Sequence, residues 1–520
     1  MSETLAHLFD QAALRLDGKK AILFLRKGRL ESQLTFSSLY QISNRVANAL
    51  VDMGLRKGDR AILFMPKSMD QVVFHLGIQK IGAISVILNP GFKKDEMHYF
   101  LKDTDSQVVI VGKKEKALVR SVDGGQPILC IDTGAPFSEE KLFPGYPSQF
   151  ANTDATDHDP ALLIYTSGTT GQPKGAILTQ RNLIQDAKNI IHTWEITEQD
   201  VLCHALPLFH IHGLCFALHT SLMVGAKIVM CDEFSPETIL DILSHRKGEL
   251  ACTLFMGVPT MYLRMIETLG GKRKNFSHLR LLASGSAPLL SKDFRRIERV
   301  FGKEPVEREG MSETGMNFSN SLRGIKKPGS IGLPLPNVQA RIVDPETLKD
   351  VRPGEVGEIW LKGPNITPGY WRKPRETEAV FANEWFRTGD LGKKDEGGYY
   401  YITDRLKHII ISGGENISPK EIESVINQHQ KVAESCVVGI PDEKWGEKVV
   451  ATVVLKSGMA LAEKEVREYC RIHLLDWKCP KAVFFFEELP RNRMGKVMKE
   501  EVVKQVLSLF PSHNNYPEQG

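Results

Sequence analysis

The sequence lacks several features that would mark other classes of protein. Its formal net charge of +4 is small for 520 residues, so composition gives no argument for nucleic-acid binding, which requires a clustered basic surface. None of the eight cysteines forms a Cys-x-x-Cys pair, and no Cys/His spacing indicates a zinc site. Most of these cysteines lie in apolar runs, where cysteine behaves as a small hydrophobic residue. Nothing asks for disulfides, and a reducing compartment is expected.

Targeting and membrane-spanning segments are missing as well. The first 20 residues hold no basic stretch followed by an apolar run, which a secretory signal requires. No apolar run reaches the ~18–20 residues of a membrane-spanning helix. The final residues, YPEQG, match no lipid-attachment or peroxisomal tag. The sequence therefore predicts a cytoplasmic protein without an integral membrane segment.

What is present is a long alternation of strand-like and helix-like segments. Short apolar strands such as 60–66 are separated by amphipathic helical stretches, which implies a largely parallel sheet covered by helices on both faces. From about Pro328, short segments joined by Gly/Pro turns predict a β subdomain. After Arg405 the pattern is that of a compact α+β unit. We therefore predict an α/β protein with a large N-terminal domain of parallel or mixed α/β sheets plus the β subdomain, residues 1–405, and a small mobile α+β domain, residues 406–520.

One segment is unusually rich in glycine and hydroxyl groups: residues 163–180, LIYTSGTTGQPKGAILTQ. Such a loop can turn backbone N–H groups and hydroxyls toward an anion, and its glycines permit close approach. Lys174 adds a point charge suited to phosphate. The preceding apolar strand places the loop at a strand's carboxyl end, where open α/β sheets bind ligands. The Walker spacing is absent, because Lys174 follows Pro173 and precedes a glycine, so the segment predicts a phosphate loop of another kind.

Residues 165–176, YTSGTTGQPKGA, resemble the phosphate-loop signature of the acyl-adenylate-forming superfamily, which includes acyl-CoA synthetases, adenylation domains of peptide synthetases and firefly luciferases. Four further motifs follow in the expected order: GMSET (310–314), WFRTGDLG (385–392), DRLKHIIISGGENISPKEIE (404–423) and PRNRMGKVMK (490–499). The resemblance covers essentially the whole chain. It implies an ATP-dependent acid–thiol ligase that forms an acyl-adenylate and pyrophosphate, and then an acyl-CoA thioester and AMP. ATP, Mg²⁺ and coenzyme A are the implied cofactors and co-substrates.

The resemblance also implies roles for single residues. Lys496 would bridge the carboxylate and the α-phosphate, since one compact ammonium can contact two oxyanions. Glu313 would hold Mg²⁺, a hard cation that prefers oxygen ligands. Asp390 would accept both ribose hydroxyls, and Arg405 would lie beside the nucleotide. The implied nucleotide-binding set is completed by Thr166, Ser167, Gly168, Thr169, Thr170, Gly171, Lys174, Ser284, Gly285, Ser286, Ala287, Glu309, Gly310, Met311 and Ser312.

Two residues of this set depart from the family pattern. Glu309 stands where the family usually has an aromatic residue near adenine, so stacking on the base from this position is in doubt, although nucleotide binding is not. Ser312 stands where many members have threonine, and either hydroxyl could reach the α-phosphate.

The two reaction steps need different arrangements. Adenylation requires Lys496 in the site, whereas thioester formation requires room for a thiol. In this family the C-terminal domain rotates about a hinge residue, which corresponds here to Lys407, and a few residues absorb such a motion. The rotation would withdraw the lysine and bring forward a loop that lines the pantetheine tunnel: Ser412, Gly413, Gly414 and Glu415.

Several of these roles have plainer alternatives. Lys496 has the sequence context of a solvated lysine in a charged helix, and Lys407 that of an ordinary linker lysine. Glu313 suits a helix-capping pair, and the segment 283–289, ASGSAPL, suits a plain strand-to-helix turn. His210, in LPLFHIHG, resembles the position that separates the acyl pocket from the thiol tunnel. The resemblance assigns it a catalytic role together with Lys174 and Lys496, and an acyl-binding role of its own. A histidine beside a strand is otherwise most often packed, and no role is carried over to His212.

The acid is suggested by strings that resemble malonyl-CoA synthetases, among them VEREGMSETGMNFSN. In that subfamily an arginine before the GMSET-like motif pairs with the distal carboxylate of malonate, and Arg308 matches it. A buried guanidinium facing an alkyl tail would stay unpaired, at a cost of ~1–3 kcal/mol or more. Malonate or another short dicarboxylate is therefore expected, unless Arg308 pairs with Glu307 or Glu309 instead.

Two other functions stay open: a CoA ligase for medium-chain fatty or aryl acids, and a stand-alone adenylating enzyme that loads a carrier protein. The expected partners are a small carboxylic acid, ATP and CoA, without nucleic acid. The chain is expected to be a monomer or a homo-oligomer.

Overall fold

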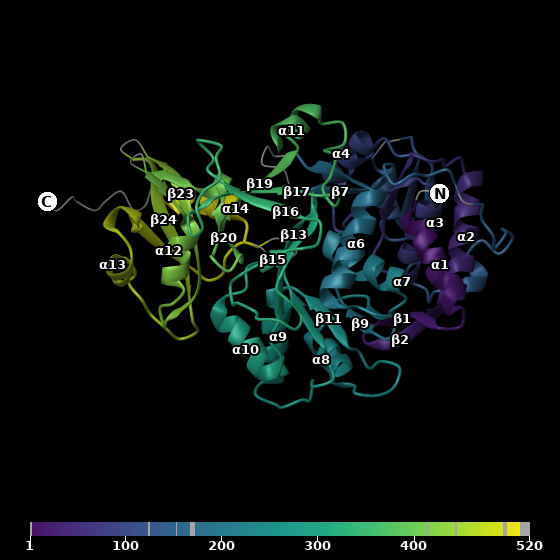
Figure 1. Ribbon diagram of the computed structural model, residues 1–520, viewed down its shortest axis with the longest axis horizontal. Helices are drawn as coiled ribbons and strands as arrows, with labels where there is room; N and C mark the ends of the chain where they lie inside the picture. The colour runs from purple at the N-terminus through teal and green to yellow at the C-terminus, as the bar shows by residue number, and fades with distance from the viewer. Residues whose placement is uncertain are drawn as a thin grey trace. The chain divides into compact units, whose positions relative to one another are not determined.

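The computed structural model describes residues 3–122, 125–151, 153–166, 172–412, 415–442, 445–491 and 497–509 (Figure 1). The chain forms two compact units. The first comprises Met1–Ala340 with Leu361–Phe386, and the second comprises Arg341–Trp360 with Arg387–Gly520. None of the helices in the described ranges is long and apolar enough to cross a membrane.

A six-stranded sheet of the first unit carries the glycine-rich segment at its edge. Its strands lie in the order β6-β5-β3-β4-β7-β8. They are β3 (Arg60–Phe64), β4 (Ile84–Ile87), β5 (Val108–Gly112), β6 (Ile128–Ile131), β7 (Pro160–Thr166) and β8 (Lys174–Thr179). Every neighbouring pair is parallel except β7 with β8, which is antiparallel. The parallel core of this sheet confirms the predicted α/β arrangement.

A nine-stranded sheet forms the other half of this unit, in the order β15-β14-β13-β12-β11-β9-β10-β1-β2. Its strands are β1 (Lys20–Arg26), β2 (Arg29–Thr35), β9 (Val201–His204), β10 (Lys227–Cys231), β11 (Leu254–Gly257), β12 (Leu281–Ser284), β13 (Val306–Met311), β14 (Gly315–Ser319) and β15 (Leu333–Pro334). Every neighbouring pair from β13 through β12, β11, β9 and β10 to β1 is parallel. The pairs β1–β2, β13–β14 and β14–β15, at the two ends of the sheet, are antiparallel. The sheet is therefore mixed, as predicted.

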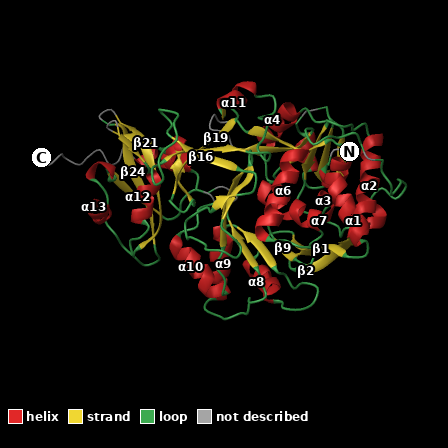
Figure 2. Ribbon diagram, viewed as in Figure 1, coloured by secondary structure: helices red, strands yellow, loops and turns green. Residues whose placement is uncertain are grey.

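A layer of helices contacts both sheets of the first unit (Figure 2). Within it, α3 packs on β3 and β4, α6 packs on β8 and β14, and α7 packs on β10. Of the 13 residues of α3, 12 are buried, as expected for a helix covered on all sides. The layer comprises α1 (Leu5–Leu16), α2 (Phe36–Asp52), α3 (Met69–Ile81), α6 (Gln180–Trp194) and α7 (Thr220–Val224), and α7 continues a π-helix, η2 (His212–His219).

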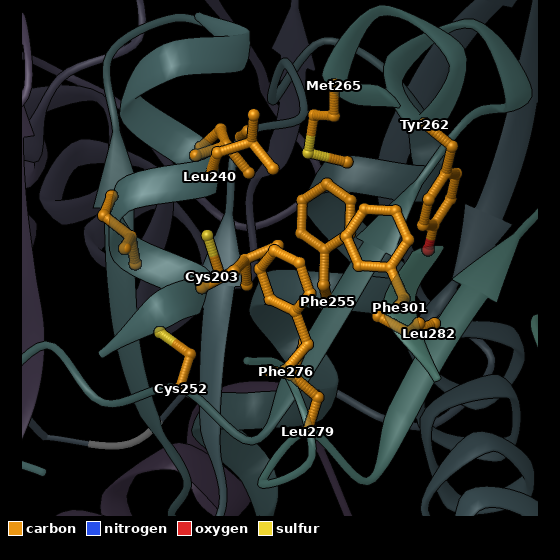
Figure 3. Packing of buried hydrophobic residues seen from close by; sticks show 14 of the residues in the cluster. Cys203, Leu240, Cys252, Phe255, Tyr262, Met265, Phe276, Leu279, Leu282 and Phe301 are labelled. Carbon is orange, nitrogen blue, oxygen red and sulfur yellow. The ribbon is translucent and has the colours of Figure 1, made fainter. Parts of the chain in front are cut away.

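Aromatic packing fixes the parallel strands of the large sheet against three outer helices. Figure 3 shows the rings of Phe255, Phe276 and Phe301 turned toward one another, with Tyr262 beside them. The centroids of Phe276 and Phe301 are 4.8 Å apart. The outer helices are α8 (Pro236–Ser244), α9 (Pro259–Leu269) and α10 (Ser291–Phe301), and the remaining helices of this unit are α4 (Lys94–Thr104), α5 (Lys116–Arg120) and α11 (Pro374–Ala379). This packing includes Leu282 and so supports β12 from one face.

The predicted β subdomain is present. Its five strands are β16 (Gln339–Val343), β17 (Gly357–Lys362), β18 (Phe381–Ala382), β19 (Trp385–Lys394) and β20 (Tyr400–Arg405). The sequence places the domain boundary between residues 405 and 406, whereas the two compact units divide within this set of strands. The boundary at 405 stays a prediction.

The second unit also holds the predicted α+β fold. Its sheet consists of β21 (Ile410–Ser412), β22 (Glu415–Ile417), β23 (Val432–Asp442), β24 (Gly446–Leu455) and β25 (Ala482–Phe486). Val449 and Ala451 on β24 belong to one core, while Val450 between them belongs to another, because successive strand residues point to opposite faces. Helices α12 (Pro419–Ile426) and α13 (Glu463–His473) cover the first face, and α14 (Lys499–Leu509) covers the second.

Candidate active site

The glycine-rich segment lies between two paired strands. Thr166, the last residue of β7, is directly opposite Lys174, the first residue of β8, and side chains opposite each other in an antiparallel pair are neighbours. The hydroxyl of Tyr165 donates to Asp103 Oδ2 at 2.7 Å and anchors the end of β7. The residues at the tip of the segment lie outside the described part of the chain: Ser167, Gly168, Thr169, Thr170 and Gly171.

Glu313 lies in the tight turn that joins β13 to β14. Gly315 ends this turn with a φ of +65°, and a Cβ there would lie 2.7 Å from Asp186 Oδ1. The same oxygen accepts a hydrogen bond from the Met316 N–H at 2.8 Å. On the other side, the Thr367 N–H donates to the Glu313 carbonyl at 2.7 Å. The turn is therefore held between α6, which carries Asp186, and a loop that follows β17.

The structure brings the turn and the glycine-rich segment together. The Glu313 side chain is buried, and its Oε1 accepts from the Thr166 hydroxyl at 3.4 Å and from the Tyr370 hydroxyl at 3.0 Å. The ammonium of Lys174 lies 5.4 Å from the centroid of the Tyr370 ring. Thr166 thus contacts Glu313, and both Glu313 and Lys174 contact Tyr370, a residue that the sequence did not single out.

A magnesium ion would fit this arrangement. Within the described part of the chain, no group of three or more His, Cys, Asp or Glu side chains is placed to hold a metal. Mg²⁺ is usually bound through one or two carboxylates together with the phosphates of a substrate, rather than by a complete protein cage. One buried carboxylate flanked by hydroxyls, beside a lysine suited to phosphate, is a donor set of that kind.

The remaining predicted residues of this stretch lie close by on the same elements. Glu309, Gly310 and Met311 end β13, and Ser312 follows in the turn. The Glu309 carboxylate accepts from the Asn317 side chain at 3.1 Å. Glu309 is therefore engaged across the β13–β14 hairpin.

A second group of polar side chains meets at the carboxyl end of β12. Ser284 is the last residue of that strand, and Ser286 has a left-handed φ of +66°. Gly285 between them has no room for a side chain, because a Cβ there would lie 2.6 Å from Arg308 Nε. The backbone of β12 thus passes directly against the guanidinium of Arg308 on β13. Ala287 follows Ser286 and is exposed.

Arg308 is 3% exposed, yet most of its guanidinium is unpaired. Nη2 donates to Ser286 Oγ at 3.2 Å, while Nε and Nη1 have no hydrogen-bond partner in the described part of the chain. The guanidinium carbon lies 5.0 Å from the ring centroid of Phe216 on the π-helix. Burial lowers the pKa of Arg308 to about 10, so the side chain stays charged at neutral pH.

The neighbouring glutamates are occupied elsewhere. Glu307 Oε1 accepts from the Gly329 N–H at 2.9 Å, and burial raises the pKa of Glu307 to about 8. Glu309 accepts from Asn317. These hydrogen bonds join Glu307 and Glu309 to residues other than Arg308, whereas the nearby charge of Glu309 raises the pKa of Arg308 against the effect of burial. A charge interaction between Arg308 and Glu309 therefore stays open.

The two histidines of LPLFHIHG take different positions. His212 is buried, with Nδ1 3.4 Å from Ser286 Oγ, and its Nε2 has no partner in the described part of the chain. Burial, aided by the nearby Arg308 charge, lowers the pKa of His212 well below its usual value. His210 packs on Phe209 with the ring centroids 4.5 Å apart, and burial lowers its pKa to about 4. His212, which had no predicted role, is the histidine that reaches the Arg308 group.

The second unit holds two further residues that the resemblance assigned to nucleotide binding. Asp390 on β19 is directly opposite Arg405 on β20, and Arg405 Nε lies 2.5 Å from Asp390 Oδ1. Ser412 pairs with Glu415 across the β21–β22 hairpin, whose tip residues Gly413 and Gly414 lie outside the described residues.

The predicted domain motion depends on Lys496 and Lys407, and the structure describes only part of this pair. Lys496 lies outside the described residues. Lys407 belongs to a short 3-10 turn, Leu406–His408, but its side chain is outside the described part.

Comparison with known protein families shows to which family the chain belongs. The family model for the AMP-binding enzyme matches residues 9–371, and the family model for the AMP-binding enzyme C-terminal domain matches residues 421–496. The chain belongs to the AMP-binding enzyme family. It is an AMP-forming acyl-CoA synthetase, an acid–thiol ligase of the acyl-adenylate-forming superfamily, with ATP and coenzyme A as substrates.

Individual relatives are similar over almost their whole lengths. The long-chain-fatty-acid–CoA ligase of Bacillus subtilis (strain 168) is 33% identical, over 97% of this chain and 95% of the relative. The mitochondrial malonate–CoA ligase of Bos taurus is also 33% identical, over 94% of this chain and 88% of the relative. The crystal structure of ATP-bound MatB from Rhodopseudomonas palustris is 36% identical with a TM-score of 0.91, covering 97% of this chain and 99% of that one.

This AMP-binding enzyme thus has two groups of polar side chains at the ends of neighbouring strands in its first unit. The Glu313 group combines a carboxylate, hydroxyls and a lysine, which suits a metal-bound polyphosphate. The Arg308 group combines a buried cation with two nitrogens that have no hydrogen-bond partner in the described part of the chain.

Proposed function

We propose that this acyl-CoA synthetase activates malonate or another short dicarboxylate, and that Arg308 binds the carboxylate that does not react. The observation that carries the proposal is the buried guanidinium of Arg308, whose Nε and Nη1 have no partner in the described part of the chain. Ser286 and His212 lie against the same point from two other elements.

The energetics of burial favour an anionic ligand there. A buried N–H group without a partner costs about 1–3 kcal/mol, and more where the group is charged. A carboxylate would satisfy two guanidinium N–H groups at once, since its two oxygens match the fork of an arginine. The alkyl tail of a fatty acid would leave those groups unpaired and would therefore be disfavoured.

The relatives support the proposal without deciding it. A malonate–CoA ligase and a long-chain-fatty-acid–CoA ligase are equally similar to this chain. A ligase for medium-chain fatty or aryl acids, and an adenylating enzyme that loads a carrier protein, are the alternatives that the experiment below must exclude.

In the proposed reaction the protein's main contribution is positioning and electrostatic stabilisation. The reacting carboxylate attacks the α-phosphate of ATP, the bond to pyrophosphate breaks, and the thiolate of CoA then displaces AMP from the acyl-adenylate. Lys174 and Thr166 contact the phosphates, Asp390 accepts the ribose hydroxyls, and Glu313 holds Mg²⁺. The metal, when bound, offsets the negative charge of the phosphates.

Lys496, His210 and Lys407 take the roles that the family resemblance implies. Lys496 bridges carboxylate and phosphate during adenylation, and His210 separates the acyl pocket from the thiol. Rotation about Lys407 exchanges Lys496 for the loop of residues 412–415. A cytoplasmic location, and a monomeric or homo-oligomeric state, remain predictions from the sequence.

The test is a panel of acids scored by AMP release, with and without CoA. Malonate, methylmalonate and succinate are compared with butyrate, octanoate and benzoate. We expect turnover with a short dicarboxylate to exceed that with butyrate, and AMP release to depend on CoA. A preference for octanoate or benzoate would refute the dicarboxylate proposal, and adenylation that CoA does not turn over would point to a carrier protein.

A further inference from the structure

Tyr370 contacts the two charged groups of the Glu313 site at once. Its hydroxyl donates to Glu313 Oε1 at 3.0 Å, and its ring lies 5.4 Å from the ammonium of Lys174, measured to the centroid. Both distances are those of direct interactions, a hydrogen bond to a carboxylate and a cation–π contact. One side chain therefore links the sequence motif that carries the lysine to the motif that carries the carboxylate.

The backbone, rather than the hydroxyl, determines where Tyr370 lies. It forms an antiparallel bridge with Ala176 on β8. The neighbouring Trp371 N–H donates to the Gly175 carbonyl at 2.8 Å, and the Ile177 N–H donates to the Gly369 carbonyl at 3.0 Å. Removing the hydroxyl alone should therefore leave the ring in place beside Lys174.

The same loop also holds the main chain of Glu313. The Thr367 N–H donates to the Glu313 carbonyl at 2.7 Å, three residues before the tyrosine that contacts its carboxylate. Two atoms of Glu313 are thus fixed by one short segment that is itself bonded to β8. The position of the carboxylate relative to Lys174 depends on this segment.

We propose that Tyr370 is a positioning residue, which aims the carboxylate of Glu313 at the metal and holds Lys174 at the phosphates. A hydroxyl that donates to a carboxylate restricts its rotation. The ring attracts the ammonium of Lys174 and so restricts where it lies. The inference rests on the proposed metal-binding role of Glu313.

The test measures binding of ATP by calorimetry over a series of Mg²⁺ concentrations, without acid or CoA. For Tyr370→Phe we expect the Mg²⁺ concentration for half-maximal enhancement of ATP binding to rise about tenfold, the usual effect of losing a hydrogen bond to a metal-binding carboxylate. ATP binding without Mg²⁺ should change less than twofold, because the ring still contacts Lys174.

Tyr165→Phe is the matched control. Its hydroxyl also donates to a carboxylate, that of Asp103, at 2.7 Å, and the residue lies beside Thr166. This variant should follow the wild type in its dependence on Mg²⁺. A Tyr370→Phe protein with the same dependence as Tyr165→Phe would overturn the inference.

Glu313→Gln separates this inference from the proposed function. If Glu313→Gln leaves the dependence on Mg²⁺ unchanged, the metal-binding role itself is wrong. If Glu313→Gln shifts it and Tyr370→Phe does not, only the role of Tyr370 is wrong. In the double variant, Tyr370→Phe should add nothing to the shift caused by Glu313→Gln, because coupled residues are not additive. Additive shifts would mean that Tyr370 acts by another route.

Discussion

Arg308 and Glu313 are five residues apart around the β13–β14 hairpin, and their charged groups differ in their hydrogen bonds. The carboxylate of Glu313 accepts hydrogen bonds from two hydroxyls. The guanidinium of Arg308 donates to one hydroxyl, and two of its nitrogens have no partner in the described part of the chain. The first charge is held by hydrogen bonds within the fold, whereas the second is the one for which we propose an anionic ligand.

The comparison separates two kinds of contribution to a binding site. Nearly all buried polar groups in folded proteins have hydrogen-bond partners, so an unpaired buried charge requires an explanation. A well-paired carboxylate, such as that of Glu313, is compatible with a structural role as well as with metal binding. Nε and Nη1 of Arg308 have no hydrogen-bond partner in the described part of the chain, although the charges of Glu309 and Asp186 act on the guanidinium, and the proposed anionic ligand would supply those partners.

The largest expected effect is that of Arg308→Met, which keeps the apolar bulk beside Phe216 and removes the charge. We expect kcat/KM for malonate to fall by about 100-fold, since hydrogen bonds to charged groups contribute about 1.5–3 kcal/mol. Turnover of butyrate by the same variant should fall little or even rise. Steady-state AMP release with both acids gives the comparison, and equal losses for the two would remove Arg308 from the acyl site.

Gly315→Ala tests whether Asp186 holds the turn that carries Glu313. The left-handed φ and the Asp186 contact both oppose a side chain there, so we expect the melting temperature to fall by about 5 °C. Gly354→Ala is the matched control, because Gly354 has a φ of +90° with nothing within 4 Å of a Cβ. If both variants melt at the same temperature, Asp186 does not hold the turn.

Ser286→Ala removes the hydroxyl that accepts from Arg308 and lies against His212. Because a ligand carboxylate would still be available to the guanidinium, we expect only a rise in KM for malonate of about three- to tenfold, the value of one hydrogen bond. The kcat should stay near that of the wild type. A fall in kcat with unchanged KM would place Ser286 at the reacting end of the acid instead.

The smallest expected effect is a pH dependence at Glu307. Burial raises its pKa from 4.5 to about 8, so the native state keeps a proton that the unfolded chain has lost. The stability that this group contributes is complete below about pH 4.5 and is lost as the pH rises toward 8. Glu307→Gln should therefore gain about 2 °C in melting temperature over the wild type between pH 6 and pH 8.5. A difference that stays constant over this range would contradict the burial of an uncharged carboxyl.

The parts of the site that the sequence revealed were those with a local signal. Glycines, hydroxyls and a lysine in one segment predicted a phosphate loop, and the structure places Thr166 in contact with Glu313 and Lys174 beside Tyr370. Tyr370 gave no such signal, because its role depends on a bridge to Ala176, almost two hundred residues earlier in the chain. The sequence also missed His212, which is buried at the start of the π-helix, whereas His210 precedes that helix and is partly exposed.

The pairing of Arg308 needed more than the strand pattern. Arg308 lies on a strand between Glu307 and Glu309, and successive residues of a strand point to opposite faces. The strand pairing is irregular after Glu309, and the Glu309 charge acts on Arg308, so the alternation alone does not decide whether the two residues pair.

The sequence by itself determined the family, the order of the motifs, the mixed α/β sheets and the chemistry of the reaction, since these depend on local patterns of residues. Only the tertiary structure decided which charges are paired. Whether a buried group has a partner depends on side chains brought together from distant strands and helices, as Phe216, Ser286 and Arg308 are. That pairing is the property on which the proposed choice of acid rests.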